Sequence, residues 1–280
     1  MYGLITRNEP ELTWPEFDRT FFEVTDVTGR SAEPSPDAVN AVSCFGDTAA
    51  GEASPELVPV SADGERATRE RPYFDWGYVC PSREEYRAGL VETIADCAAV
   101  APDVRLDDVG FPREGYCYCS VCDRRFAESE HDDRPTWRAA TITEFVADAA
   151  AEVPGRTYFT LYPDPYPGHL YRRSGIDVDA IAEYVDEFVV PLYDTAYGTT
   201  YWIEAIASAF AERLPKPVSV ELYAVDIDVD ALLRAATVAE AYAESVIFGY
   251  DASTARAALR RRAAEDGEGV EHRPGSDDGA

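Results

Sequence analysis

The sequence has few basic residues, and this scarcity excludes some kinds of partner. Lysine and arginine together number 25 against 53 aspartates and glutamates, so the formal net charge is -28, and Lys216 is the only lysine. Proteins bind phosphate-rich surfaces through clustered basic residues. The basic residues of this chain are scattered. We therefore expect neither nucleic acid nor an anionic membrane surface as a partner.

Long apolar runs are also missing. No uninterrupted apolar stretch approaches the about 18 residues that a membrane-spanning helix needs. Even so, 46% of the 280 residues are hydrophobic, which is enough for a substantial core. The first residues, "MYGLITRNEPELTW", have neither the basic region nor the apolar region of a secretory signal. These features predict a soluble, cytoplasmic protein, and they leave its oligomeric state open.

The second half of the chain contains a repeated pattern. Short β-rich runs, each ending in Tyr, Asp or both, alternate with stretches of helical period, and the runs span residues 156–164, 187–194, 217–224 and 245–251. Continuous apolar runs are typical of strands buried on both faces. The pattern begins one unit earlier, at residues 103–111. Five consecutive βα units predict an α/β fold of the (β/α)8 TIM-type barrel class, with an open doubly wound sheet as the alternative.

The N-terminal half fits this pattern less regularly. Candidate strands lie at residues 2–6, 19–27 and 38–45, but the links between them are too short for full crossover helices. We expect an abbreviated or irregular first half, followed by a long functional loop over residues 46–77. Residues 1–260 are predicted to form a single barrel domain, and residues 261–280 an acidic, disordered tail.

Half of the six cysteines lie in one short segment, "CYCSVCDRRF". Cys117, Cys119 and Cys122 supply three thiolates at a spacing that can converge on one tetrahedral ion, and a structural zinc site usually needs four ligands. Cys80, in "YVCPSREEYR", is the candidate fourth ligand, with His131 and His169 as alternatives. Disulfides and free buried thiols are the other interpretations, but a cytoplasmic chain disfavours disulfides.

The segments "CPSREEYR" and "CYCSVCDRRF" resemble the β-galactosidases of glycoside hydrolase family forty-two. Those enzymes carry C-P-x-x-x-x-Y-R in the third βα loop and C-x-C-x-x-C-x-x-x-F after the fourth strand, and their four cysteines bind zinc. The resemblance covers residues 71–126 and implies a structural zinc site in a glycoside-cleaving barrel. Their fourth strand ends in Asn-Glu, whereas this one ends in Asp107-Asp108. Galactoside specificity therefore does not follow.

Acidic and tyrosine side chains end the predicted strands, where a barrel carries its chemistry. Glycoside hydrolysis needs two carboxylates around an oxocarbenium-like transition state. The first candidate pair is Asp108 as general acid/base with Glu221 as nucleophile, which matches the strand positions used by the resembled family. The second is Asp107 as nucleophile with Asp194 as acid. The predicted substrate-binding residues are Trp76, Tyr162, Asp164, Tyr193, Tyr223 and Tyr250.

Three functional classes follow from these features. A glycosidase-like hydrolase acting on a carbohydrate or glycoside is the leading one, and a non-catalytic carbohydrate-binding TIM barrel is the alternative. A metal-dependent hydrolase is disfavoured, because the chain has only three histidines. Spread acidity, with arginine in place of lysine, also resembles the proteins of salt-loving archaea, in which carboxylates maintain solubility at high salt. The composition thus predicts a halophilic protein.

Overall fold

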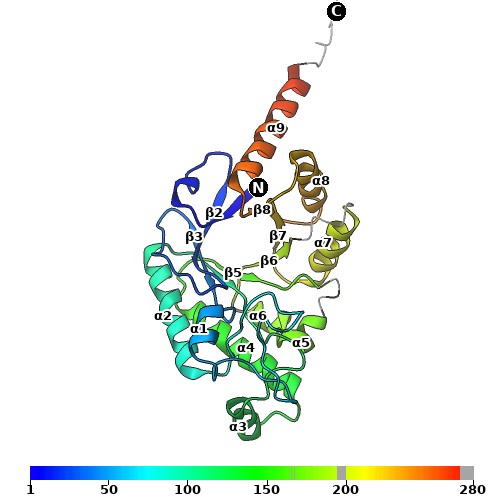
Figure 1. Cartoon of the computed structure of the whole chain (residues 1–280). Helices are drawn as coiled ribbons and strands as arrows, with labels where there is room; N and C mark the ends of the chain where they lie inside the picture. Colours follow the sequence, from blue (N-terminus) through cyan, green and yellow to red (C-terminus); the bar gives the residue numbers. More distant parts are fainter. Residues whose placement is uncertain (165, 167, 194–199, 272–280) are drawn as a thin grey trace, which may run out of the picture.

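The computed structural model of the chain contains a closed barrel of eight parallel strands, in the order β1 to β8 (Figure 1). The structure describes residues 1–164, 166, 168–193 and 200–271. The strands are β1 (Tyr2–Thr6), β2 (Arg19–Thr25), β3 (Val39–Ser43), β4 (Val104–Asp107), β5 (Thr157–Thr160), β6 (Glu187–Leu192), β7 (Val218–Tyr223) and β8 (Ser245–Gly249). Since β1 pairs with β8, the sheet closes, which confirms the predicted barrel and excludes the open sheet.

The strands bury both of their faces, as their continuous apolar runs predict. One set of side chains fills the barrel interior, and it includes Ile5, Phe21, Tyr158, Val189 and Ile247. A second, larger cluster lies between the strands and the surrounding helices. Alternation of side chains along each strand assigns successive residues to these two layers.

The helical layer is thin over the first three strands, as the short links predict. A single 3-10 turn, η1 (Glu9–Glu11), lies between β1 and β2, and residues 26–38 connect β2 to β3 without a helix. The six-residue helix α1 (Thr48–Ala53) then begins the long segment that leads to α2. The irregular first half is therefore confirmed.

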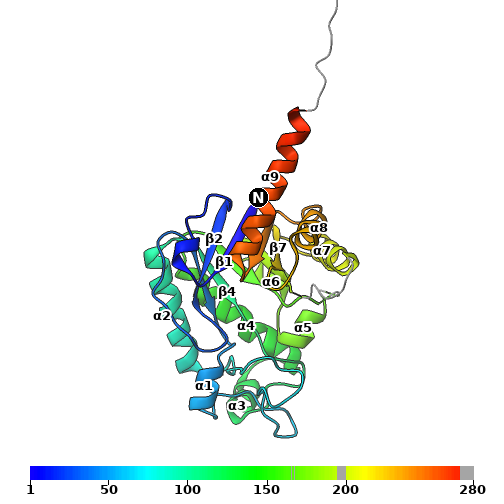
Figure 2. The same cartoon turned by 45° about the horizontal axis from the view of Figure 1, so that its top comes forward.

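Most of the remaining helices lie on the outside of the barrel, whereas α3 lies at one end of the molecule (Figures 1 and 2). These helices are α2 (Glu84–Val100), α3 (Ser120–Glu128), α4 (Arg134–Ala151), α5 (His169–Ser174), α6 (Val178–Ile181), α7 (Tyr201–Arg213), α8 (Val229–Ala239) and α9 (Ala252–Glu271). In both views α1 and α3 lie at the same end of the molecule, where the long segment before α2 also runs.

The predicted domain boundary at residue 260 falls inside α9, whose far end projects away from the barrel in both views. Residues 272–280 of the predicted tail lie outside the described residues. The division into a barrel and a disordered tail stays a prediction. In the described part of the chain, no helix is both long and apolar enough to cross a membrane.

Candidate active site

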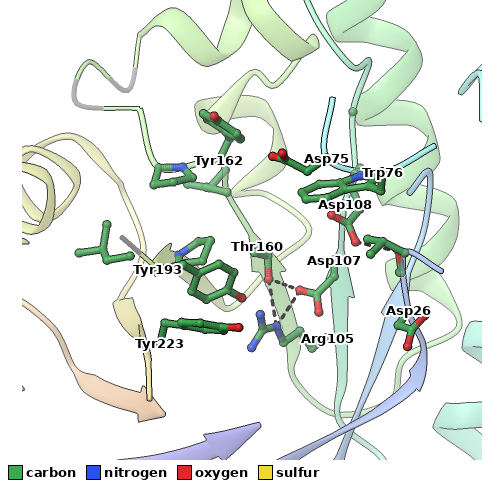
Figure 3. Close-up of a pocket in the computed structure, with 18 of the residues that line it drawn as sticks. Asp26, Asp75, Trp76, Arg105, Asp107, Asp108, Thr160, Tyr162, Tyr193 and Tyr223 are labelled. Atoms are coloured by element: carbon green, nitrogen blue, oxygen red, sulfur yellow. Dashed lines mark hydrogen bonds and ion pairs between the residues drawn. The ribbon is translucent and has the colours of Figure 1, made fainter. Parts of the chain in front are cut away.

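A cavity of about 940 Å³ opens at the carboxyl ends of the strands. This volume is at the upper end of the range of about 300–1,000 Å³ that is typical of ligand pockets. Figure 3 shows Asp107, Asp108 and Trp76 on one side of the cavity, with Tyr193 and Tyr223 opposite. The location is the one at which barrels of this type carry out their chemistry.

Asp107 is the last residue of β4, and Arg105 and Thr160 hold its carboxylate. Arg105 Nε donates to Asp107 Oδ1 at 2.7 Å, and the Thr160 hydroxyl donates to the same oxygen (Figure 3). The Asp107 side chain is 14% exposed, whereas that of Arg105 is 1% exposed. A buried guanidinium of this kind stabilises an anion that still faces the cavity.

Glu221 lies beneath the cavity floor, and its side chain is completely buried. Its Oε2 forms an ion pair with Arg105 Nη1 at 2.5 Å, and its Oε1 accepts a hydrogen bond from the Tyr193 hydroxyl. Burial raises the pKa of Glu221, and the opposing charge of Arg105 limits that shift. Both carboxylate oxygens are thus engaged, so Glu221 orients Arg105 and Tyr193 from below.

Asp108 follows β4 in the left-handed backbone region, with φ of 54°, which aspartate tolerates better than most residues. Its Oδ2 accepts a hydrogen bond of 2.7 Å from the Ser43 hydroxyl. The chain passes close by at Gly46, where an added Cβ would lie 3.1 Å from the Asp108 side chain. No basic side chain of the described residues pairs with this carboxyl group.

The surroundings of Asp108 favour its neutral form. Burial, together with the charge of Asp107, raises its pKa from 3.8 to about 7, although the hydrogen bond from Ser43 opposes the shift. Asp108 therefore carries its proton over much of the range below neutral pH. General acid catalysis of glycoside cleavage uses a carboxyl group that keeps its proton near neutral pH.

A further set of charged residues comes from the first two strands. Glu23, inside β2, pairs with Arg7 and accepts a hydrogen bond of 3.3 Å from the Tyr250 hydroxyl. Burial raises the pKa of Glu23, and Arg7 opposes that shift. Tyr250 has a φ of 78°, which is strained for a bulky residue and aims its ring at this network.

Aromatic rings form the rest of the cavity wall. Tyr193, Tyr223 and Tyr250 pack against one another, with ring centroids 5.5 to 6.1 Å apart. Trp76 lies opposite, 5.8 Å from the ring of Tyr78. Aromatic faces of this kind pack well against flat, partly apolar ligands.

Most of the residues predicted from the sequence meet at this cavity. Asp107, Asp108 and five predicted substrate-binding residues line it: Trp76, Tyr162, Tyr193, Tyr223 and Tyr250. Glu221 lies below the lining, and Asp194 lies outside the described residues. Asp164 lines a separate cavity, where its carboxylate accepts a hydrogen bond from the Tyr166 backbone and contacts His169.

Several residues of the site were not predicted from the sequence. Arg105 and Glu23 are charged residues inside predicted strands, where burying a charge requires a partner, so the sequence carried a signal for both. Ser43, Asp26 and Asp75 have no comparable signal, because polar residues at strand ends and in loops are common.

Four cysteines form a separate cluster. The sulfur atoms of Cys80, Cys117, Cys119 and Cys122 all lie within 4.8 Å of one another, and all four residues are buried. Cys80 Sγ lies 3.3 Å from Cys122 Sγ and 3.9 Å from Cys119 Sγ. Thiolates around one tetrahedral zinc ion lie about 3.8 Å apart, given a Zn–S bond of about 2.3 Å. The donor set and its spacing fit a metal ion.

Backbone and hydroxyl groups surround these sulfurs. The amides of Val60 and Cys119 each donate to Cys117 Sγ at 3.3 Å, and Ser82 Oγ lies 3.3 Å from Cys122 Sγ. The Ser82-x-x-Glu85 sequence resembles a helix capping box. The N-cap of α2 is instead Arg83 without a side-chain hydrogen bond, and Ser82 faces the cysteines.

Two solved glycoside hydrolase structures have a similar fold. The PgaB (BpsB) glycoside hydrolase domain from Bordetella bronchiseptica matches with a TM-score of 0.68 at 11% identity, over 96% of this chain and 97% of that one. Alpha-L-fucosidase isoenzyme 2 from Paenibacillus thiaminolyticus matches with a TM-score of 0.66 at 12% identity, over 95% of this chain and 49% of that one. At such identities the similarity shows a glycoside hydrolase-like fold and no more.

A scan of the sequence against protein-family models finds no match, and a search of curated proteins also finds none. Membership of glycoside hydrolase family forty-two is therefore not shown, although the cysteine segment resembles that family. The fold is a closed eight-stranded TIM-type barrel similar to those of the two glycoside hydrolase structures, and the chain also contains a buried four-cysteine cluster.

Proposed function

We propose that this protein hydrolyses a glycosidic bond of a carbohydrate, with Asp108 as the general acid. The observation that carries the proposal is the pair of adjacent strand-end carboxyl groups in different environments. Asp108 holds a proton up to a pH of about 7, and Asp107 is held by Arg105. In glycoside cleavage one carboxyl protonates the leaving oxygen and the other faces the positive charge on the sugar ring.

In this proposal the Asp108 carboxyl gives its proton to the glycosidic oxygen as the bond from that oxygen to the anomeric carbon breaks. A water molecule then adds to the anomeric carbon and returns a proton to the Asp108 carboxylate, so the products are the free sugar and the alcohol. Asp107, which lines the same cavity, stabilises the positive charge that develops on the ring. Glu221 was predicted as a nucleophile, but its two oxygens bind Arg105 and Tyr193. We assign it a positioning role, in which it keeps Arg105 directed at Asp107.

We also propose that Cys80, Cys117, Cys119 and Cys122 bind a structural zinc ion. Four thiolates close the coordination of zinc and leave no position for water, so the ion would not take part in hydrolysis. Cys80 lies four positions after Trp76, and Cys117 six positions after the cavity residue Phe111. The ion would join the two loops that form this wall of the cavity.

The test is a screen of aryl glycosides at high salt with the wild type and the variants D108N, D107N and E221Q. We expect turnover by the wild type, with a decline as the pH rises through about 7, where Asp108 loses its proton. D108N and D107N should lose about 10²–10⁴ in rate. E221Q should lose about 10², because it weakens the hold on Arg105, which positions Asp107.

D63N is the matched control, since Asp63 is exposed and lies outside the cavity lining. Its rate should equal that of the wild type. If the folded wild type binds sugars but hydrolyses no glycoside, the protein is the carbohydrate-binding barrel that the sequence left as the alternative. If E221Q lowers the rate of hydrolysis more than D107N does, Glu221 takes part in the chemistry.

A further inference from the structure

A second cavity, of about 540 Å³, adjoins the first. Three arginines line it, Arg113, Arg172 and Arg173, and Arg173 also lines the first cavity. Such a group is unusual in a chain with a net charge of -28 and only 25 basic residues. It places positive charge beside a catalytic cavity whose floor is acidic.

A buried arginine fixes the backbone of both segments that carry these side chains. Arg138, on α4, is 2% exposed. Its guanidinium donates to the carbonyl oxygens of Arg113 and Arg173 at 2.9 Å and of Glu114 and Arg172 at 3.1 Å. Four hydrogen bonds from one planar group hold the two segments together, so the arginines converge before any ligand arrives.

Part of the charge in this cavity is balanced within the protein. Arg172 forms an ion pair with Glu114, with Nη2 2.8 Å from Oε1, and both side chains are largely exposed. Asp164 lies 3.5 Å from His169 Nδ1. These two pairs leave the remaining arginines to account for the excess positive charge.

Arg113 and Arg173 have no carboxylate partner among the described residues. The Arg173 guanidinium stacks on Tyr162, 3.6 Å from the ring centroid, and that of Arg113 stacks on Tyr73 at 4.6 Å. Stacking orients a guanidinium and leaves its edge free for a planar or tetrahedral oxyanion. Arg113 Nη2 donates to the Tyr73 carbonyl at 3.5 Å. The other donors of the two guanidinium groups remain available to a ligand.

We infer that this second cavity is a subsite for an anionic group of the saccharide substrate, a carboxylate or a sulfate ester. The inference deepens the proposed function and rests on it, since it assigns the substrate to the acidic glycans. The two cavities share Arg173, so a chain cleaved at Asp108 would extend directly into the subsite. The acidic floor around Asp107 and Glu23 would repel the same group, which limits it to the arginine side.

The test uses small anions and needs no turnover. Full-length protein labelled with ¹⁵N-arginine is titrated with D-glucuronate, with sulfate and with D-glucose at constant ionic strength. The Nε–H signals of Arg113 and Arg173, assigned with R113K and R173K, are followed by NMR. We expect saturable shifts of both signals with glucuronate, with sulfate or with both, and none with glucose. R173Q should weaken the binding seen at Arg113 about tenfold.

R124Q is the control, because Arg124 is exposed on α3 away from the cavity, and it should leave the titration unchanged. If R173Q does not fold, R113Q gives the same test at the Arg173 signal. Equal shifts at Arg124, an equal response to glucose, or no saturable shift would overturn the inference. Because catalysis is not measured, a failure to hydrolyse any glycoside would refute the proposed function and leave this result standing.

Discussion

Asp107 and Asp108 are neighbours in the sequence, yet they meet different surroundings. Asp107 accepts a hydrogen bond from the Arg105 guanidinium, whereas Asp108 accepts one only from the Ser43 hydroxyl. A cation favours the charged form of a carboxyl group, and burial without a cation favours the neutral form. The left-handed backbone at Asp108 lets both side chains serve one cavity. The different surroundings of the two carboxyl groups therefore arise from local structure.

The first prediction concerns the stability of D108N. The pKa of Asp108 is raised from 3.8 to about 7 in the folded state, so folding favours its protonated form. Its contribution to stability is complete below pH 4 and is lost as the pH rises through 7. Asparagine does not titrate. Thermal unfolding should therefore show that the melting temperature of D108N, relative to the wild type, increases between pH 5 and pH 8.

Each kcal/mol of change in the free energy of unfolding should shift the melting temperature by about 2–4 °C for a chain of this size. The exposed control D63N should show no change of this kind between the two pH values. A difference between D108N and wild type that is the same at both pH values would mean that Asp108 is ionised throughout. It would then not be the proton donor.

The sequence identified the carboxylates of β4 and the tyrosines of the later strands, because strand ends can be read from apolar runs. It did not reveal the contacts of Glu221 with Arg105 and Tyr193. An acid inside a strand signals either a partner or a reaction, and here the partner is Arg105, three strands away in the barrel. Such pairing depends on barrel closure and on which side chains face inward, which a single segment does not encode.

At the scale of elements, the cysteine cluster joins two connections that are poor in regular structure. Cys80 ends the long segment before α2, and the other three cysteines precede or begin α3. The side chain of Arg134, at the start of α4, donates to the Cys117 carbonyl at 2.9 Å and so adds a third segment. Connections of this kind contain little regular structure, so a metal ion would stabilise them strongly.

The second prediction is that purified wild type contains one zinc ion per chain and that C119S contains none. Losing a closed thiolate site should lower the free energy of unfolding by about 4 kcal/mol or more. Elemental analysis and denaturant unfolding measure the two effects. C97S is the control, since Cys97 is buried on α2 outside the cluster, and it should keep its zinc. Zinc that persists in C119S would contradict the assignment.

All eight strands could be located from the sequence, since each is a short apolar run between turn residues. The absence of full crossover α-helices between the first three strands also followed from the shortness of the links between them. The start of α2 could not be predicted from its local sequence. The Ser82-x-x-Glu85 pattern suggests a capping box, but Ser82 faces Cys122 and does not cap the helix. Local capping preferences yield where a tertiary partner, here the cysteine cluster, uses the same side chain.

For the whole molecule, the dominant feature is the net charge of -28. Like charges spread over a surface repel one another, and this repulsion destabilises the compact state at low ionic strength. The third prediction is that the melting temperature rises by several degrees between dilute buffer and molar potassium chloride, as screening shortens the range of the repulsion. Calorimetry or circular dichroism measures it.

Choline chloride at the same ionic strength is the control for this effect, because screening depends on ionic strength and not on the identity of the cation. The two salts should therefore act alike. An unchanged melting temperature in both would contradict the interpretation of the acidic surface as an adaptation to salt. A rise with potassium alone would indicate specific ion binding instead.

Asp108 is proposed to protonate the leaving group of a glycoside, and substrates whose leaving groups differ in acidity test this role. Wild type and D108N are compared on the 4-methoxyphenyl and 2,4-dinitrophenyl glycosides of the sugar that the screen identifies. The poor leaving group needs a proton and the good one does not. D108N should lose about 10²–10⁴ in kcat/KM on the methoxyphenyl glycoside and far less on the dinitrophenyl glycoside. An equal loss on both substrates would contradict the account.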